Sequence, residues 1–267
     1  MTALEAARTF ASSNDLPSDQ LSVLRDGSNL IVHLMPAPVV LRVATLTARI
    51  RLDPLPYLAR EVELLSYLAG IGAPAMAPSH LVAAGPHLVD GWAMSAWSYV
   101  DHEAPGTPDD WAAFAALDEL HAALRGFSGV LPVLNPATDD LDRALRFAVE
   151  TGLLTAAAAA ALTVRRDALL AELLDLAPDR QPLHGDAFAR NAVRSGTGIV
   201  WLDFEDCCSG PAVWDLAVLV RRDRDPAVVA EIERRHGRAA LRVATELRAV
   251  QAEPWMLIHE ARLERGW

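Results

Sequence analysis

The segment His184–Asn191, together with the aspartate at position 203, constrains this chain more than any other feature of its sequence. Asp186 stands on a short glycine-containing loop, Asn191 follows five residues later, and Asp203 comes after a second hydrophobic run. The hydrophobic runs between Asn191 and Asp203 predict a β-hairpin that returns the chain to the same place. Phosphoryl transfer requires a carboxylate that accepts a hydroxyl proton, with a carboxamide and a second carboxylate that hold Mg²⁺. The spacing therefore predicts a phosphoryl-transfer site.

Three segments resemble the aminoglycoside phosphotransferase and choline kinase-like family of small-molecule kinases: His184–Asn191, Trp201–Asp206 and Gly210–Ala217. This family has His-Gly-Asp where protein kinases have His-Arg-Asp. The resemblance implies that Asp186 is the catalytic base and that Asn191 and Asp203 are Mg²⁺ ligands. It also implies that His184 and Asp215 are structural and brace the catalytic loop through hydrogen bonds.

The same resemblance implies an α+β, bilobal protein-kinase-like fold. An antiparallel-sheet N-lobe of five strands would bind the nucleotide and occupy residues 1–100. A mainly helical C-lobe, residues 101–267, would carry the catalytic and substrate-binding groups. Apolar periodicity predicts helices over residues 111–124, 140–149, 157–176 and 226–265. The last of these is expected to be interrupted at Gly237 and Pro254, and His121 is expected to be a packed structural histidine.

The chain contains no lysine, so all 24 of its basic side chains are arginines. A kinase fold usually has a lysine on its third strand that pairs with the nucleotide phosphates and with a helix glutamate. In the predicted strand 38–43, Arg42 stands in this position. We interpret Arg42 as a phosphate ligand, in preference to a dead nucleotide site. Glu61 stands at the family's helix position, with Glu63 and a plain surface acid as the alternatives.

Three further residues, Gly27, Ser28 and Asn29, lie in a turn between two predicted strands, where backbone N–H groups can approach phosphates. An ordinary hairpin turn is the alternative. Trp97, Ser98 and Tyr99 lie where the resemblance places the hinge between the lobes, and their backbone is expected to bind the purine edge. The two aromatic side chains could equally belong to the core.

Composition indicates a folded protein, since 52% of the residues are hydrophobic and 22% are charged. The net charge of −11 argues against nucleic acid as a partner, because like charges repel. A cationic substrate would suit this charge, although an acidic surface also serves solubility alone. No apolar run approaches the ~20 residues of a membrane helix. Cys207 and Cys208 are adjacent and have no other cysteine to pair with, which favours a cytoplasmic location.

Taken together, these features predict ATP- or GTP-dependent phosphorylation of a hydroxyl on a small molecule, with Mg²⁺ as the metal. An antibiotic, an amino sugar or an amino alcohol would be the acceptor, and the arginine-rich composition is compatible with an antibiotic-resistance role in a high-GC bacterium. Two alternatives remain. One is a catalytically silent pseudokinase that binds a nucleotide or ligand, and the other is a kinase that acts on a protein or a protein-bound sugar.

Overall fold

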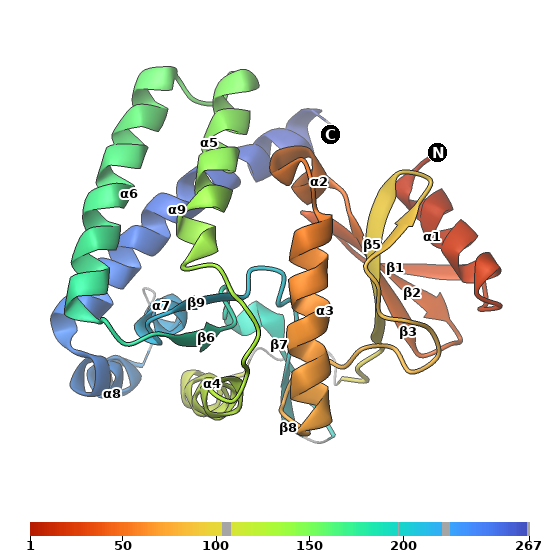
Figure 1. Ribbon diagram of the computed structural model, residues 1–267, viewed down its shortest axis with the longest axis horizontal. Coiled ribbons are helices and arrows are strands. Elements are labelled where there is room, and N and C mark those ends of the chain that lie inside the picture. The colour runs from red at the N-terminus through yellow and green to blue at the C-terminus, as the bar shows by residue number, and fades with distance from the viewer. Residues whose placement is uncertain (103–107, 197, 221–224, 266–267) are drawn as a thin grey trace. The chain divides into compact units, whose positions relative to one another are not determined.

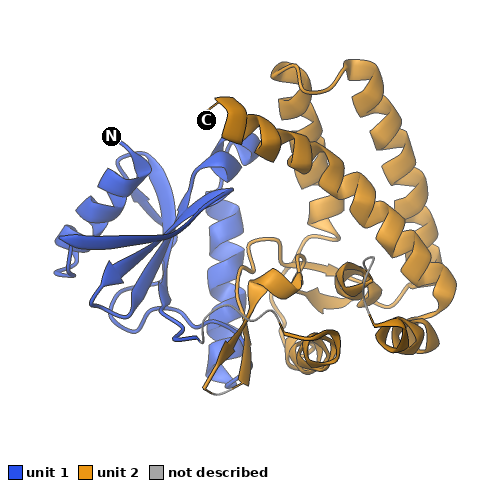
Figure 2. Ribbon diagram, turned by 180° about the vertical axis from the view of Figure 1, so that it is seen from behind, with its two compact units in different colours: residues 1–102 blue, residues 103–267 orange. Residues whose placement is uncertain are grey.

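The computed structural model describes residues 1–102, 108–196, 198–220 and 225–265. The chain divides into two compact units, Met1–His102 (unit 1) and Glu103–Trp267 (unit 2), as Figures 1 and 2 show. Unit 1 is built around an antiparallel sheet, and unit 2 is mainly helical. The α+β class predicted from the sequence is therefore confirmed.

The sheet of unit 1 has five antiparallel strands in the order β1-β2-β3-β5-β4. Its strands are β1 (Gln20–Asp26), β2 (Asn29–Met35), β3 (Val39–Ala44), β4 (His87–Val89) and β5 (Trp92–Ser98). The central strand, β3, pairs with β2 and with β5, so Arg42 lies between Ile31 and Ser95. This position buries Arg42, of which only 4% is exposed.

Alternation along β3 sends Leu41 and Val43 to one face of the sheet and Arg42 to the other. Helix α1 (Ala3–Ser13) covers the first face, and its alanines and Phe10 share one apolar core with the strands. Helix α3 (Leu55–Gly70) lies on the second face, so the sheet is enclosed between the two helices (Figure 1). Arg42 consequently points toward α3.

Two helices of unit 1 were not anticipated, α1 and the short α2 (Leu46–Arg51). Helix α1 begins with a capping box. The Thr2 hydroxyl accepts the N–H of Glu5 at 3.2 Å, and the Glu5 carboxylate accepts the N–H of Thr2 at 2.6 Å. This reciprocal pair is a known signature of a helix start, so the sequence did contain a signal for α1.

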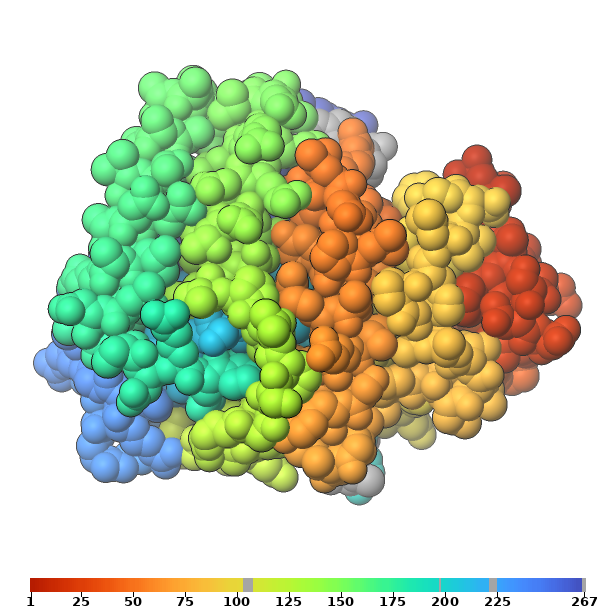
Figure 3. Space-filling model, viewed as in Figure 1, coloured from red at the N-terminus to blue at the C-terminus, as the bar shows by residue number. Residues whose placement is uncertain are grey.

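The long helices of unit 2 agree with the predicted ranges to within a residue or two. They are α4 (Asp110–Leu124), α5 (Asp139–Glu150), α6 (Ala156–Leu176), α8 (Pro226–His236) and α9 (Arg238–Arg265). Three short helices were not predicted: η1 (Asn135–Ala137), α7 (Val213–Leu216) and η3 (Ala217–Leu219). Helices α5 and α6 form a hairpin, and their side chains make one continuous side of unit 2 (green in Figure 3). Among the described residues, no helix is long and apolar enough to cross a membrane.

Helix α9 packs against α5, α6, α7 and α8, and it is the helix that these elements share. Gly237, with φ of 86°, separates α8 from α9 as predicted. The interruption predicted at Pro254 is wrong, because Pro254 lies inside α9 and is buried. A proline normally removes one helical hydrogen bond and breaks the helix. Here the packing of α9 on its neighbours outweighs that loss.

Candidate active site

The catalytic loop, residues 184–191, connects two small sheets of unit 2. Strand β6 (Gln181–Leu183) leads into the loop and pairs with β9 (Cys208–Gly210). A single 3-10 turn, η2 (Ala189–Asn191), leads out of it into the hairpin β7 (Ala192–Ser195) and β8 (Gly198–Trp201). The N–H of Leu202 donates to the carbonyl of Asn191 at 2.7 Å. The open end of the hairpin therefore brings Asn191 next to the residue that precedes Asp203, as the spacing predicted.

Asp215 of α7 braces the start of this loop. Its fully buried carboxylate accepts the N–H of His184 at 2.9 Å and the N–H of Gly185 at 3.0 Å. The Nε2 of His121, in α4, lies 3.0 Å from the Oδ2 of the same carboxylate. Burial raises the pKa of Asp215, but the hydrogen bond and charge of His121, together with the charges of His184 and Arg248, outweigh burial, so the pKa lies below its ordinary value. His121 is thus a buried structural histidine, as predicted.

The ring of His184 fixes the next part of the loop. Its Nε2 donates to the carbonyl of Leu202 at 2.9 Å, and its Nδ1 accepts the N–H of Asp186 at 3.2 Å. Burial lowers the pKa of His184, which favours the neutral ring that these two bonds require. His184 and Asp215 therefore hold the loop through hydrogen bonds, which is the structural role that the family resemblance implied.

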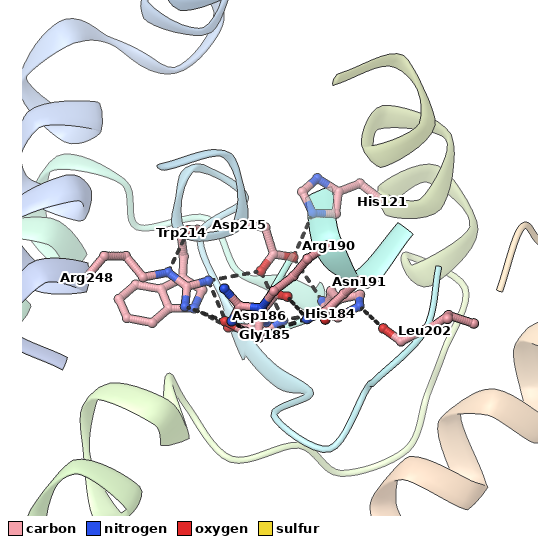
Figure 4. A network of polar contacts seen from close by, with 10 residues as sticks. All are labelled: His121, His184, Gly185, Asp186, Arg190, Asn191, Leu202, Trp214, Asp215 and Arg248. Carbon is pink, nitrogen blue, oxygen red and sulfur yellow. Dashed lines mark hydrogen bonds and ion pairs between the residues drawn. The ribbon is translucent and has the colours of Figure 1, made fainter. Parts of the chain in front are cut away.

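Asp186 has its carboxylate at the centre of the polar network drawn in Figure 4. Its Oδ2 accepts the Nδ2 of Asn191 at 3.1 Å, and the same Nδ2 donates to the Asp186 carbonyl at 2.9 Å. The guanidinium of Arg190 lies 3.4 Å from Oδ2 and 4.2 Å from the ring centroid of Phe188. The side chain of Asp186 is 21% exposed, so a substrate hydroxyl can approach it.

Asn191 and Asp203 are suited to a divalent cation. Because the Nδ2 of Asn191 is anchored on Asp186, the amide oxygen is directed elsewhere and can act as a ligand. Asp203 has φ of 68°, a strained value for an aspartate that is typical of functional sites. Mg²⁺ takes one or two protein oxygens and completes its shell with phosphates and water. Among the described residues, no group of three or more His, Cys, Asp or Glu side chains is placed to hold a metal ion.

In unit 1, Arg42 and Glu61 form a buried ion pair, with Nη2 and Oε1 separated by 3.2 Å. Arg42 comes from the centre of the sheet and Glu61 from the face of α3 that covers it. Glu63, the competing candidate, is exposed on the other side of α3. The choice between the two glutamates that the sequence left open is thus decided by the helix face.

The turn at Gly27–Asn29 is tied to the start of α2 through Thr45, which precedes the helix, and Thr47, which lies in its first turn. The Ser28 carbonyl accepts the N–H of Thr47 at 3.0 Å and the hydroxyl of Thr45 at 3.2 Å. The Thr47 hydroxyl donates to the buried side chain of Asn29. These contacts fix the turn, and its role toward phosphates stays a prediction.

The predicted hinge residues lie at the end of β5, with Trp97 and Ser98 as its last two residues and Tyr99 directly after it. Trp97 is buried and donates its Nε1 to Ser95 at 2.9 Å, which makes its side chain part of the core. The backbone N–H groups of Ser98 and Tyr99 donate to Ala77 and Pro38, both at 2.9 Å. The ring of Tyr99 stacks on His33 with centroids 4.1 Å apart. Both N–H groups are therefore engaged within the protein, and the contact of this segment with the purine edge stays a prediction.

Arg248 and Trp214 belong to the site, and the sequence did not reveal them. Trp214 donates its Nε1 to the carbonyl of Gly185 at 3.2 Å, and Arg248 donates to the same carbonyl at 2.8 Å. Burial lowers the pKa of Arg248. Arg248 is one of many arginines on helices of this chain, so no local pattern distinguishes it.

A comparison with protein-family models matches residues 23–250 to the phosphotransferase enzyme family (APH). The chain belongs to this family. The match covers both units, including the catalytic loop and the Arg42–Glu61 pair. A comparison with curated protein sequences finds no match.

Among solved structures, this phosphotransferase is similar to amicoumacin kinase hAmiN in complex with AMP-PNP, Ca²⁺ and Ami, with a TM-score of 0.67 and 14% identity over 98% of this chain and 89% of that chain. It is similar to choline kinase LicA from Streptococcus pneumoniae, with a TM-score of 0.64 and 15% identity over 97% and 91%. It is also similar to the aminoglycoside phosphotransferase APH(3'')-Id from Streptomyces rimosus, with a TM-score of 0.64 and 13% identity over 94% of this chain and 99% of that chain. These similarities confirm the predicted protein-kinase-like fold.

Replacing Arg42 tests the nucleotide site of unit 1. Arg42→Ala is expected to lower the free energy of unfolding by about 3 kcal/mol, because Glu61 loses its buried cation, and to raise the nucleotide KM. Arg42→Lys should keep much of the activity, and Glu61→Ala should raise KM less than Arg42→Ala. Chemical denaturation and steady-state kinetics measure these effects, with the exposed Arg8→Ala of α1 as the control. Unaltered nucleotide kinetics in Arg42→Ala would assign the phosphates to another arginine.

Proposed function

We propose that this phosphotransferase moves the γ-phosphoryl group of ATP or GTP to a hydroxyl of a small molecule. The observation that carries the proposal is the catalytic loop. Asp186 presents a partly exposed carboxylate, Asn191 is anchored on it at 3.1 Å, and the buried carboxylate of Asp215 holds the loop backbone. A site kept only for binding would not require this arrangement of base, carboxamide and brace.

In the proposed reaction, Asp186 accepts the proton of the acceptor hydroxyl. The hydroxyl oxygen forms a bond to the γ-phosphorus while the bond from this phosphorus to the β,γ-bridging oxygen breaks, which leaves ADP or GDP. Positioning and charge stabilisation account for most of the rate in such transfers. The bonds from Asp215 and His184 to the loop backbone supply the positioning, since they fix the Cα of Asp186 before substrate arrives.

Asn191 and Asp203 would hold Mg²⁺, which when bound neutralises charge on the nucleotide phosphates. Arg42 would bind the phosphates from unit 1, and Glu61 would orient its guanidinium through the 3.2 Å ion pair. An arginine can do this work in a chain without lysine, because its planar guanidinium binds phosphate oxygens in pairs. Residues 27–29 and 97–99 would contribute the remaining contacts to the nucleotide.

We propose a hydroxylated amine as the acceptor, with antibiotics, amino sugars and amino alcohols as the classes to test. The net charge of −11 favours a cationic molecule over an anionic one. The similar structures include kinases named for amicoumacin, choline and aminopropanol, and aminoglycoside phosphotransferases. We also propose a cytoplasmic location, because the reaction would consume intracellular nucleotide and the two cysteines of the sequence are adjacent.

Removal of the proposed metal ligands tests this function against a pseudokinase. Asn191→Ala and Asp203→Ala are each expected to weaken Mg²⁺-dependent nucleotide binding by about tenfold or more, because the metal loses a protein oxygen. Calorimetry with ATP and with GTP, each with and without Mg²⁺, measures the effect. Asp118→Ala, which removes an exposed acid of α4, is the control and should bind as the wild type does.

A screen for nucleotide consumption with hydroxylated amines as acceptors completes the test. Turnover that depends on both Mg²⁺ and the acceptor supports the proposal and identifies the acceptor class. The pseudokinase would be favoured if the nucleotide affinity were the same with and without Mg²⁺ in the wild type and in both variants, and if no acceptor gave turnover.

A further inference from the structure

Arg248 belongs to α9 and contacts the loop at Gly185, which lies 63 residues earlier in the sequence (Figure 4). Only 7% of Arg248 is exposed. Its Nη2 donates to the carbonyl of Gly185 at 2.8 Å, and its Nε donates to the carbonyl of Trp214 at 3.3 Å. The guanidinium also lies over the ring of Trp214, with its carbon 4.1 Å from the ring centroid. Three separate contacts therefore fix the orientation of this side chain.

The same guanidinium faces two carboxylates. Its Nη1 lies 3.6 Å from the Oδ1 of Asp186, and its Nη2 lies 3.9 Å from the Oδ1 of Asp215. Within the described part of the chain, Nη1 is buried and has no hydrogen-bond partner. Burying a charged donor without a hydrogen bond is costly. The ionic contact between Nη1 and the Asp186 carboxylate offsets part of this cost.

The two oxygens of Asp186 are thereby made different. Oδ2 accepts the amide of Asn191 at 3.1 Å and faces Arg190 at 3.4 Å. Oδ1 faces only Arg248 among the described residues, at 3.6 Å, which is too long for a hydrogen bond. Arg248 thus attracts Oδ1 by charge and leaves its lone pairs available to a substrate hydroxyl.

Arg190, the other arginine near Asp186, differs from Arg248 in its exposure and in the element that carries it. The side chain of Arg190 is 53% exposed, and it comes from the loop that it would have to hold. Arg248 is buried, comes from a separate helix, and is fixed by two carbonyls and an aromatic ring. A screened, exposed ion pair contributes little, whereas a buried and oriented charge can set a geometry.

We propose that Arg248 is a positioning residue for Asp186, which directs Oδ1 toward the acceptor hydroxyl as the atom that takes its proton. This inference rests on the proposed phosphotransferase function. Arg248 acts through Asp186, the proposed base, with which it makes its 3.6 Å ionic contact. Its loss should therefore lower kcat and leave the affinity for Mg-nucleotide unchanged.

Two substitutions separate charge from hydrogen bonding. Arg248→Gln can still donate to the carbonyl of Gly185 but has no charge for Asp186, whereas Arg248→Lys keeps the charge. The expected order of kcat is wild type, then Lys, then Gln, with Gln at least tenfold below wild type and nucleotide KM within twofold. A loss of this size corresponds to modest misplacement of a reacting group. Arg166→Gln is the matched control.

Arg166 is suited to this comparison because it is also a buried arginine of unit 2 that donates to a backbone carbonyl, that of Ala137 at 3.1 Å. Thermal unfolding of all variants corrects the rates for the folded fraction. A kcat for Arg248→Gln that equals or exceeds that of Arg248→Lys, or that matches Arg166→Gln, would overturn the positioning role.

A double-mutant cycle tests whether Arg248 acts through Asp186. In an Asp186→Asn background, Arg248→Gln is expected to cost almost nothing further, because the base that it positions is already absent. Fully additive losses would contradict the proposal. If the wild-type enzyme turned over no nucleotide with any acceptor, the proposed function and this inference would both fail. An active wild type with an equally active Arg248→Gln would defeat the inference alone.

Discussion

Asp186→Asn is expected to remove most phosphoryl transfer while the protein folds normally and still binds Mg-nucleotide. The asparagine has the same shape as aspartate, and the loop backbone stays held by Asp215 and His184. The substitution removes the carboxylate that we propose takes the hydroxyl proton. General base catalysis contributes about 10²–10⁴-fold, so kcat should fall by a factor in this range or above it.

Steady-state kinetics with the identified acceptor measure the loss of kcat. Calorimetry measures whether the affinity for Mg-nucleotide is kept. Asp175→Asn, which changes an exposed acid of α6, is the control and should retain full turnover. Near wild-type kcat in Asp186→Asn would mean that another group accepts the proton. A large loss of nucleotide affinity would instead mean that Asp186 serves mainly to bind the metal.

Gly185→Ala is the second change with a large expected effect. Gly185 has φ of 88°, a backbone conformation that residues other than glycine adopt only with strain. A Cβ on this residue would lie 1.8 Å from the carbonyl oxygen of Asp206, a backbone atom that cannot swing away as a flexible side chain can. The loop must therefore move, and the bonds from its N–H to Asp215 and from its carbonyl to Arg248 are lost or distorted.

We expect Gly185→Ala to destabilise unit 2 by about 2 kcal/mol or more, the order of cost of a forced backbone conformation. The kcat should fall by about 10²-fold in the fraction that remains folded, because Asp186 is displaced. Chemical denaturation and kinetics corrected for folded protein measure both. Gly196→Ala is the matched control, since a Cβ there meets nothing within 4 Å and its backbone is not in the left-handed region. Equal effects of the two substitutions would show that the contact with Asp206 is unimportant.

The catalytic loop could be predicted from the sequence because its function is encoded over a short stretch. Asp186 and Asn191 are five residues apart, and a two-stranded hairpin is enough to return the chain to Asp203. Local turn chemistry and strand pairing decide such an arrangement, and both are visible in the order of the residues. The long helices of unit 2 were predictable for the same reason, since their apolar residues recur at helical spacing.

The pair of Arg42 and Glu61 was only partly predictable. The absence of lysine drew attention to Arg42, and the family position favoured Glu61 over Glu63. The pair itself depends on α3 packing on one face of the sheet, and on which face β3 presents at Arg42. A one-residue change of register would have reversed that face.

The sequence by itself determined the class of the protein and the loop at residues 184–191, because neighbouring residues supply the proposed base, the carboxamide and the turn. The bracing roles of His184 and Asp215 followed from the family resemblance. Only the tertiary structure decided that Arg248 faces Asp186. Arg248 lies 63 residues beyond Gly185, on a helix that other helices of unit 2 hold in place. Its role comes from burial between Trp214 and two carboxylates, and burial is a property of the packed chain. The sequence of a helix does not distinguish an arginine that is exposed to water from one that faces a buried carboxylate.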